Sequence, residues 1–191
     1  MYDLAELLEG MRGVCFRALQ GAFDDFRKNE QRFFAEPAMQ AADRNVLARE
    51  GPLSLPFRCD ALVVSPDGKE VTPHIFNVER RWSFSPVEFE YGGLLIALSS
   101  CHWENVKVAI WGDAQTVAGG VKAWFEAAFI PVEQLAEDAI QNVVHDLSGF
   151  QAKDGVTTFL LDCGTMPVDQ MFALFDHLRG AGATRVELSM P

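Results

Sequence analysis

The sequence has no long apolar run, few basic residues and no closely spaced cysteines. Its most apolar stretch, residues 92–98, is far shorter than the roughly 20 residues that a membrane-spanning helix needs, so we expect no membrane anchor. Sixteen lysines and arginines stand against twenty-seven acids, which gives a formal charge of −11 at pH 7. Nucleic-acid phosphates and anionic membrane surfaces would repel such a chain, and we expect neither as a partner.

The four cysteines are spread along the chain without a C-x-x-C pair. This spacing suits neither a disulfide-stapled small domain nor a standard zinc site, and no glycine-rich phosphate-binding motif is present. We therefore expect reduced thiols, no metal and no cofactor. Acids stand near the start of the chain where a secretory signal would carry Lys or Arg, which predicts a cytoplasmic protein.

A chain of 191 residues with 49% apolar residues predicts one α+β domain, residues 1–191, built from three stretches. Residues 1–56 form a helical segment, in which a three-to-four spacing of apolar residues predicts a long helix, followed by a second, shorter helix at 37–49. The stripe of the first helix comprises Leu4, Leu7, Leu8, Met11, Cys15, Leu19, Phe23 and Phe26.

Residues 57–111 predict a central antiparallel sheet. The run Ser65-Pro66-Asp67-Gly68 places Pro and Gly where a tight turn needs them, so 57–64 and 70–78 should form a hairpin. Strands at 87–91, 94–98 and 106–111 would complete a meander. Glu88 and Glu90 alternate with apolar neighbours and are best explained as the wet face of one strand, although they could be paired carboxylates.

Residues 112–191 predict an acidic helical part that ends in a β-α-β unit. Helices are expected at 121–129 and from Pro131 to 147, and then strand 156–161, helix 168–178 and strand 185–188. The expected fold class is thus α+β: an N-terminal helix, a central antiparallel meander, and C-terminal helices with a terminal β-α-β unit.

The negative charge gathers in the last stretch, where residues 112–191 carry eleven acids and four bases. On the helix expected at 132–147, Glu133, Glu137 and Asp138 form an acidic face. Such a face is either simply solvated or a docking surface for a basic partner. In the turn at 102–105, Trp103 belongs either to the core or, with Glu104, to an exposed anchor of the kind found at interfaces.

Cys163 is the main catalytic candidate because it lies where a strand leads into a helix. A thiol at a helix N-terminus can be an activated nucleophile, and His177 and Asp162 could assist it. A cysteine phosphatase would have an arginine six residues later, but Asp169 stands there. Burial as a structural thiol is the alternative. His145 and His177 fall on expected helices and should lie at the solvent edge or the C-terminal end of these helices rather than bind a metal.

Residues 89–98 (FEYGGLLIAL) and 102–106 (HWENV) are similar in texture to small acidic bacterial immunity proteins, which neutralise toxins of competing cells. The resemblance implies a cytoplasmic, non-enzymatic protein that binds a basic toxin through an acidic surface. We therefore predict a protein-binding module of the immunity or inhibitor type. The residues expected to occlude its partner are Glu133, Glu137, Asp138, Trp103 and Glu104. The alternative is a small Cys-dependent enzyme or small-molecule-binding protein that uses Cys163.

Overall fold

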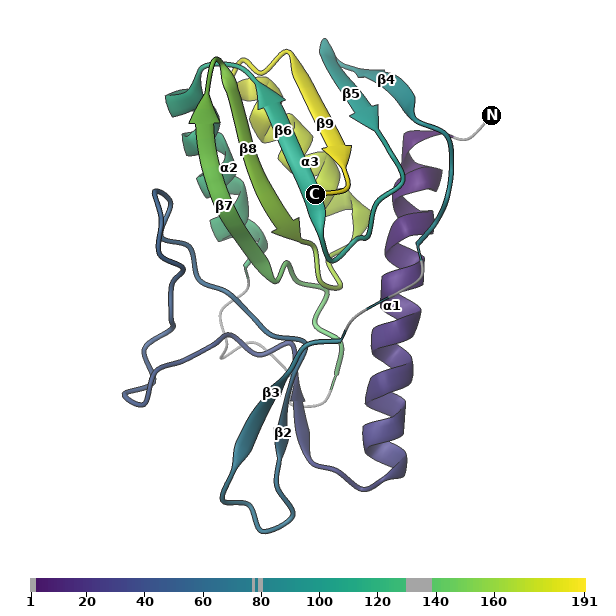
Figure 1. Ribbon diagram of the computed structural model, residues 1–191, viewed down its shortest axis with the longest axis vertical. Coiled ribbons are helices and arrows are strands. Elements are labelled where there is room, and N and C mark those ends of the chain that lie inside the picture. Colours follow the sequence, from purple (N-terminus) through teal and green to yellow (C-terminus); the bar gives the residue numbers. More distant parts are fainter. Residues whose placement is uncertain (1–2, 77, 79–80, 130–138) are drawn as a thin grey trace.

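The computed structural model describes residues 3–76, 78, 81–129 and 139–191. Within this part of the chain, three helices and nine strands form one α+β molecule with two separate sheets (Figure 1). The expected α+β class, with an N-terminal helix and a C-terminal part of helices and strands, is confirmed. No helix in the described ranges is both long and apolar enough to cross a membrane.

Helix α1 (Leu4–Lys28) links the two sheets along one side of the molecule (Figure 1). Asp3 caps its first turn in a reciprocal pair of hydrogen bonds with Glu6, which satisfies backbone N–H groups that the helix leaves free. The predicted apolar stripe is buried from Leu4 to Phe23. In the last turns, Phe23 and Phe26 pack against Phe33 with ring centroids 5.2 and 5.3 Å apart.

The large sheet has six strands in the order β4-β5-β9-β6-β8-β7. Neighbouring strands are antiparallel except β5 and β9, which are parallel. The strands are β4 (Val87–Tyr91), β5 (Leu94–Leu98), β6 (Val106–Trp111), β7 (Asp146–Lys153), β8 (Val156–Asp162) and β9 (Arg185–Ser189).

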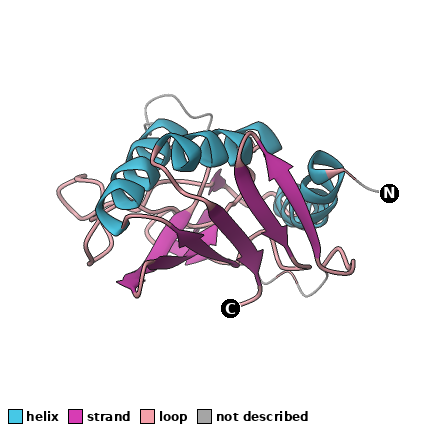
Figure 2. Ribbon diagram, turned by 90° about the horizontal axis from the view of Figure 1, so that it is seen from above, coloured by secondary structure: helices cyan, strands magenta, loops and turns pink. Residues whose placement is uncertain are grey.

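Helices α2 (Ala114–Ala128) and α3 (Val168–Gly180) cover one face of this large sheet. None of the described helices lies on the other face (Figure 2). The predicted β-α-β unit is present as β8-α3-β9, with β6 inserted between the two parallel strands. Alternating residues of β6, β8 and β9 are buried, as expected for a sheet with one covered face.

The small sheet has the order β1-β2-β3. Its strands are β1 (Phe33–Ala35), β2 (Ala61–Val64) and β3 (Val71–His74), all paired antiparallel. The predicted hairpin is confirmed as β2-β3, with Gly68 at φ +72 in its turn. The continuous meander over 57–111 is not formed, because this hairpin pairs with β1 and because β9 separates β5 from β6.

Two helix predictions are wrong within the described residues. Residues 37–49 form a loop tied by isolated bridges such as Gln40 to Val46, so α1 is the only helix of the stretch 1–56 that the structure describes. Residues 139–145 are not helical, and 146–147 begin strand β7 rather than ending a helix. Residues 130–138, the first part of the helix expected there, lie outside the described residues.

Candidate functional site

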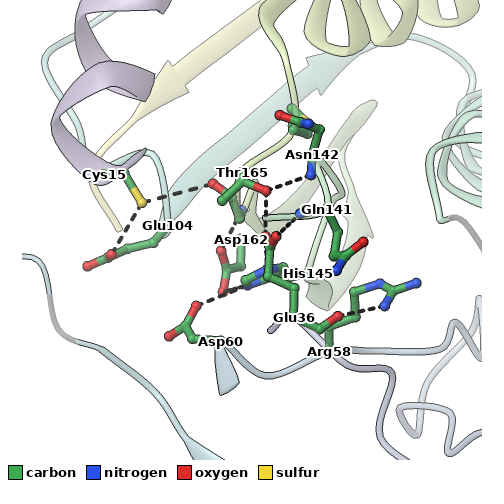
Figure 3. A network of polar contacts seen from close by, with 12 residues as sticks. Cys15, Glu36, Arg58, Asp60, Glu104, Gln141, Asn142, His145, Asp162 and Thr165 are labelled. Carbon is green, nitrogen blue, oxygen red and sulfur yellow. Dashed lines mark hydrogen bonds and ion pairs between the residues drawn. The ribbon is translucent and has the colours of Figure 1, made fainter. Parts of the chain in front are cut away.

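A histidine is buried at the junction between the two sheets (Figure 3). His145 directly precedes β7, and its backbone is held on both sides. Its N–H donates to Asp162 O at 3.0 Å, and its C=O accepts from Arg58 N at 2.9 Å. Its side chain is 1% exposed. The solvent-edge position predicted for His145 is therefore wrong, because the segment is not a helix and lies between β8 and the chain that leads to β2.

Carboxylates face both nitrogens of the His145 ring. Nε2 lies 2.8 Å from Glu36 Oε1, and Nδ1 lies 3.2 Å from Asp60 Oδ1 and 3.7 Å from Asp162 Oδ2. A neutral imidazole can donate to a carboxylate from only one of its nitrogens, whereas the imidazolium donates from both, so contacts to carboxylates at both nitrogens favour the imidazolium. Burial by itself lowers the pKa of His145, but the charge of Asp162 and hydrogen bonds to Asp162, Asp60 and Glu36 outweigh it and raise the pKa well above its ordinary value.

Glu36 ties the end of β1 to the large sheet. Its fully buried carboxylate also accepts hydrogen bonds from the Thr165 hydroxyl and the Gln141 backbone N–H. Its backbone C=O accepts from Arg58 Nη1 at 2.6 Å. Glu36 has φ +49, a left-handed conformation that non-glycine residues adopt at some cost. The surrounding bonds hold this residue in a conformation that the chain alone disfavours.

Gly164 allows the His145 ring to approach the backbone after β8. It has φ +51, and a Cβ placed there would lie 2.3 Å from His145 Cδ2. No side chain fits at this distance, so only glycine leaves room for the ring. The Gly164 N–H donates to Asp162 Oδ1 at 2.9 Å, which fixes the carboxylate that faces the histidine.

A pocket of about 220 Å³ opens beside this group of residues. Its floor includes Asp162 and Ser148, which alternate along β8 and β7 with the buried Leu161 and Leu147 and so face the side of the sheet without helices. Six charged residues line the pocket: Arg49, Arg58, Asp60, Glu104, Asp146 and Asp162. Acids therefore outnumber bases there.

At the rim of the pocket, Arg49 is already engaged within the molecule. Its Nε lies 3.1 Å from Asp146 Oδ1, and its guanidinium stacks over the Phe57 ring at 4.0 Å from the centroid. Ile75 stands at the same rim and is 81% exposed. The pocket thus already accommodates one basic side chain against a carboxylate, beside an exposed apolar group.

Glu104 titrates near neutrality on the wall of the pocket. Burial raises its pKa to about 7; the hydrogen bond from Val78 N to Oε1, at 2.8 Å, opposes this, and the charges of Asp162 and Asp60 add to it. Its Oε2 lies 3.7 Å from Cys15 Sγ. At neutral pH, Glu104 therefore exchanges between its charged and neutral forms.

The structure places the residues predicted to dock a partner in different environments. Trp103 is 1% exposed, so an exposed anchor at this position is wrong and the core alternative holds. Its neighbour Glu104 lines the pocket instead. Glu133, Glu137 and Asp138 lie outside the described residues, and the acidic face stays a prediction.

The predicted catalytic group does not assemble. Cys163 is fully buried, and burial followed by the charge of Asp162 raises its pKa well above the ordinary value, which opposes thiolate formation. Asp162 contacts His145 and Gly164 N–H. His177 is exposed near the opposite end of α3 from Cys163. Of these three candidates, only Asp162 belongs to the site.

Glu36, Asp60 and His145 were not predicted as site residues, because the topology that brings them together is not encoded locally. One signal was present: the β-branched pair Val143-Val144 directly before His145 favours an extended segment, and both valines are buried. An extended segment would have placed His145 at a strand end, where polar residues of neighbouring strands meet.

Within the described residues, no group of three or more His, Cys, Asp or Glu side chains has a geometry that could hold a metal ion. Comparisons with protein-family models, with curated proteins and with solved structures found no significant match in any of the three. The function is therefore inferred from the geometry of the junction and its pocket.

Proposed function

We propose that this protein is a non-enzymatic, cytoplasmic protein-binding module of the immunity or inhibitor type, which occludes a basic partner. The observation that supports this most directly is the pocket at the junction, where four carboxylates face two arginines. A cationic side chain of a partner would enter it and meet Asp162 and Glu104. Charge complementarity of this kind raises the association rate and fixes the orientation of a complex.

The size of the pocket favours a side chain over a cofactor. Ligand pockets for drug-sized molecules occupy about 300–1,000 Å³, whereas this one measures about 220 Å³. It opens on the uncovered face of the large sheet, so a partner could lie across that face while one side chain inserts. A standard interface needs about 800 Å² from each partner, which a sheet face of six strands can supply.

The charge and the thiols agree with the proposed partner and compartment. A net charge of −11 favours a basic protein and disfavours nucleic acid. All four cysteines are free and buried, as in a reducing compartment. The alternative, an enzyme that uses Cys163, has little physical support because the thiol is buried and its pKa is raised.

A pair of isosteric probes tests the pocket without knowledge of the partner. We expect N-acetyl-L-arginine N-methylamide to shift the backbone amide NMR signals of residues 104–105 and 162–165 with a dissociation constant on the order of 1 mM. The citrulline analogue has nearly the same shape without the charge and should leave them unchanged. The titration is run at pH 8, where Glu104, with its pKa of about 7, is ionised.

Matched variants complete this test. Glu104→Gln should weaken arginine binding several-fold, whereas Glu126→Gln, an exposed substitution on α2, should have no effect. Equal binding of the arginine and citrulline probes, or shifts confined to other parts of the protein, would show that the pocket does not select a cation.

A further inference from the structure

The two sheets are joined across a buried group of charged side chains. We call His145, Glu36, Asp60 and Asp162 the junction cluster. Glu36 follows β1 and Asp60 precedes β2, so both belong to the small sheet, whereas His145 precedes β7 and Asp162 ends β8. The Asp60 carboxylate also accepts from Phe76 N at 2.7 Å, just after β3. Every ionic contact of the histidine with Glu36 or Asp60 therefore crosses from one sheet to the other.

One proton supplies the ionic contacts of this arrangement. The hydrogen bonds from Gln141 N and Thr165 Oγ1 to Glu36, and from Arg58 N to His145 O, also cross the junction and do not depend on that proton. With the proton, the His145 ring donates toward Glu36 from Nε2 and toward Asp60 from Nδ1. Without it, only one nitrogen can donate, and the carboxylates of Glu36, Asp60 and Asp162 surround a neutral ring. A buried carboxylate that loses its partner is strongly destabilised, because removing one member of a buried ion pair leaves an uncompensated charge.

Other charged and titratable groups around the cluster do not replace that proton. The cations near it include Arg58, whose Nη1 is bonded to the Glu36 carbonyl, and Arg12 of α1, whose Nε is bonded to Met166 O. Arg49, which lines the same pocket, is paired with Asp146. The remaining groups are acids or thiols that add negative charge on ionisation, and they come from α1, the segment before β2, the turn before β6 and the end of β8: Cys15, Cys59, Glu104 and Cys163.

Helix α1 provides a second attachment that does not depend on protons. Its last turns hold the small sheet through the packing of Phe23 and Phe26 on Phe33. Its first half is fixed to the loop between β8 and α3, where Arg12 donates to Met166 O at 2.9 Å and to Thr165 O at 3.2 Å. The small sheet can thus part from the large one at the cluster while it remains on the helix.

We propose that the junction cluster is a proton-controlled latch: loss of the His145 proton releases the small sheet from the end of the large sheet while α1 retains both. The pocket gives the proton a path, since Asp60 and Asp162 line it and the Asp162 side chain is 30% exposed. Release also opens the pocket, because Arg58 and Asp60 move away from Glu104 and Asp162. The latch does not depend on what the pocket binds.

Trypsin cleavage measures the release with an internal control. Arg58 is 4% exposed at the junction, whereas Arg44 lies exposed in the loop before β2. The ratio of initial cleavage rates after Arg58 and after Arg44 cancels the pH dependence of the protease. For the wild type, we expect this ratio to rise at least about tenfold between pH 7 and pH 10, as local opening exposes Arg58.

Three variants identify the responsible group. His145→Gln should give a high ratio at every pH, and His177→Gln, an exposed histidine, should behave as the wild type. Asp162→Asn removes a charge that favours the imidazolium and should move the rise to lower pH. The proposal is overturned if folded His145→Gln protects Arg58 as the wild type does, or if the pH-dependent rise persists in it. Should His145→Gln not fold, an unmoved rise in Asp162→Asn overturns it.

Discussion

At the scale of single residues, the site depends on one glycine that packs against one imidazole. Gly164 and His145 are nineteen positions apart, and the ring occupies the space that a Cβ at residue 164 would need. The position also has φ +51, so a larger residue meets two separate penalties, a strained backbone and a steric overlap. The cost of the steric overlap can be isolated by comparison with Gly149. That residue has a similar φ of +63, but a Cβ placed there would have no neighbouring atom within 4 Å.

We expect Gly164→Ala to lower the free energy of unfolding by about 3 kcal/mol and Gly149→Ala by about 1 kcal/mol. The difference reflects displacement of the His145 ring, since both substitutions place a non-glycine residue in the left-handed region. Urea unfolding of both variants at pH 7 measures the two values. Equal losses of unfolding free energy in the two variants would mean that the His145 ring moves aside at no cost, and that Gly164 does not position the histidine.

At the scale of elements, the chain encodes what is local and leaves the pairing of distant strands open. The stripe of α1, the turn around Gly68 and the β8-α3-β9 unit are all predictable, because each rests on residues close together in sequence. The insertion of β9 between β5 and β6 is not predictable, because strand order depends on contacts between residues 74 to 90 positions apart in the sequence.

The error at residues 139–147 shows why the site was only partly predictable. Ala139, Val143 and Leu147 recur at helical spacing, yet 139–145 are not helical and Leu147 lies in β7. Tertiary pairing with β8 overrides the local pattern. Because His145 sits in this segment, its environment could not be derived, whereas Asp162 and Glu104 were named from their positions at a strand end and in a turn.

At the scale of the whole molecule, we expect stability to fall as pH rises. The folded state raises the pKa of Glu104 from 4.5 to about 7, and raises the pKa of Asp162 and His145 above 3.8 and 6.5. Burial raises the pKa of both acids. For His145, burial lowers the pKa, but the surrounding carboxylates outweigh this effect and raise it. The folded protein thus holds these protons more tightly than the unfolded chain, and each group destabilises it as pH rises toward its folded pKa.

The free energy of unfolding should therefore be about 2 kcal/mol higher at pH 5 than at pH 8, after allowance for the partial exposure of Glu104. Urea unfolding at the two pH values measures this difference. The contribution of Glu104 is lost between its unfolded pKa of 4.5 and its folded pKa of about 7. Glu104→Gln should flatten the lower part of the profile, whereas Glu126→Gln on α2 should leave it unchanged. Stability that is constant or rises from pH 5 to pH 8 would contradict the assigned shifts.

The junction, and with it the pocket and the latch, rests on a charged histidine enclosed by carboxylates. Long-range ¹H–¹⁵N NMR spectra, assigned by comparison with His145→Gln, report the protonation of both ring nitrogens of this residue directly. We predict that Nδ1 and Nε2 of His145 both carry a proton at pH 7. A neutral His145 ring at pH 7, with one bare nitrogen, would contradict the account.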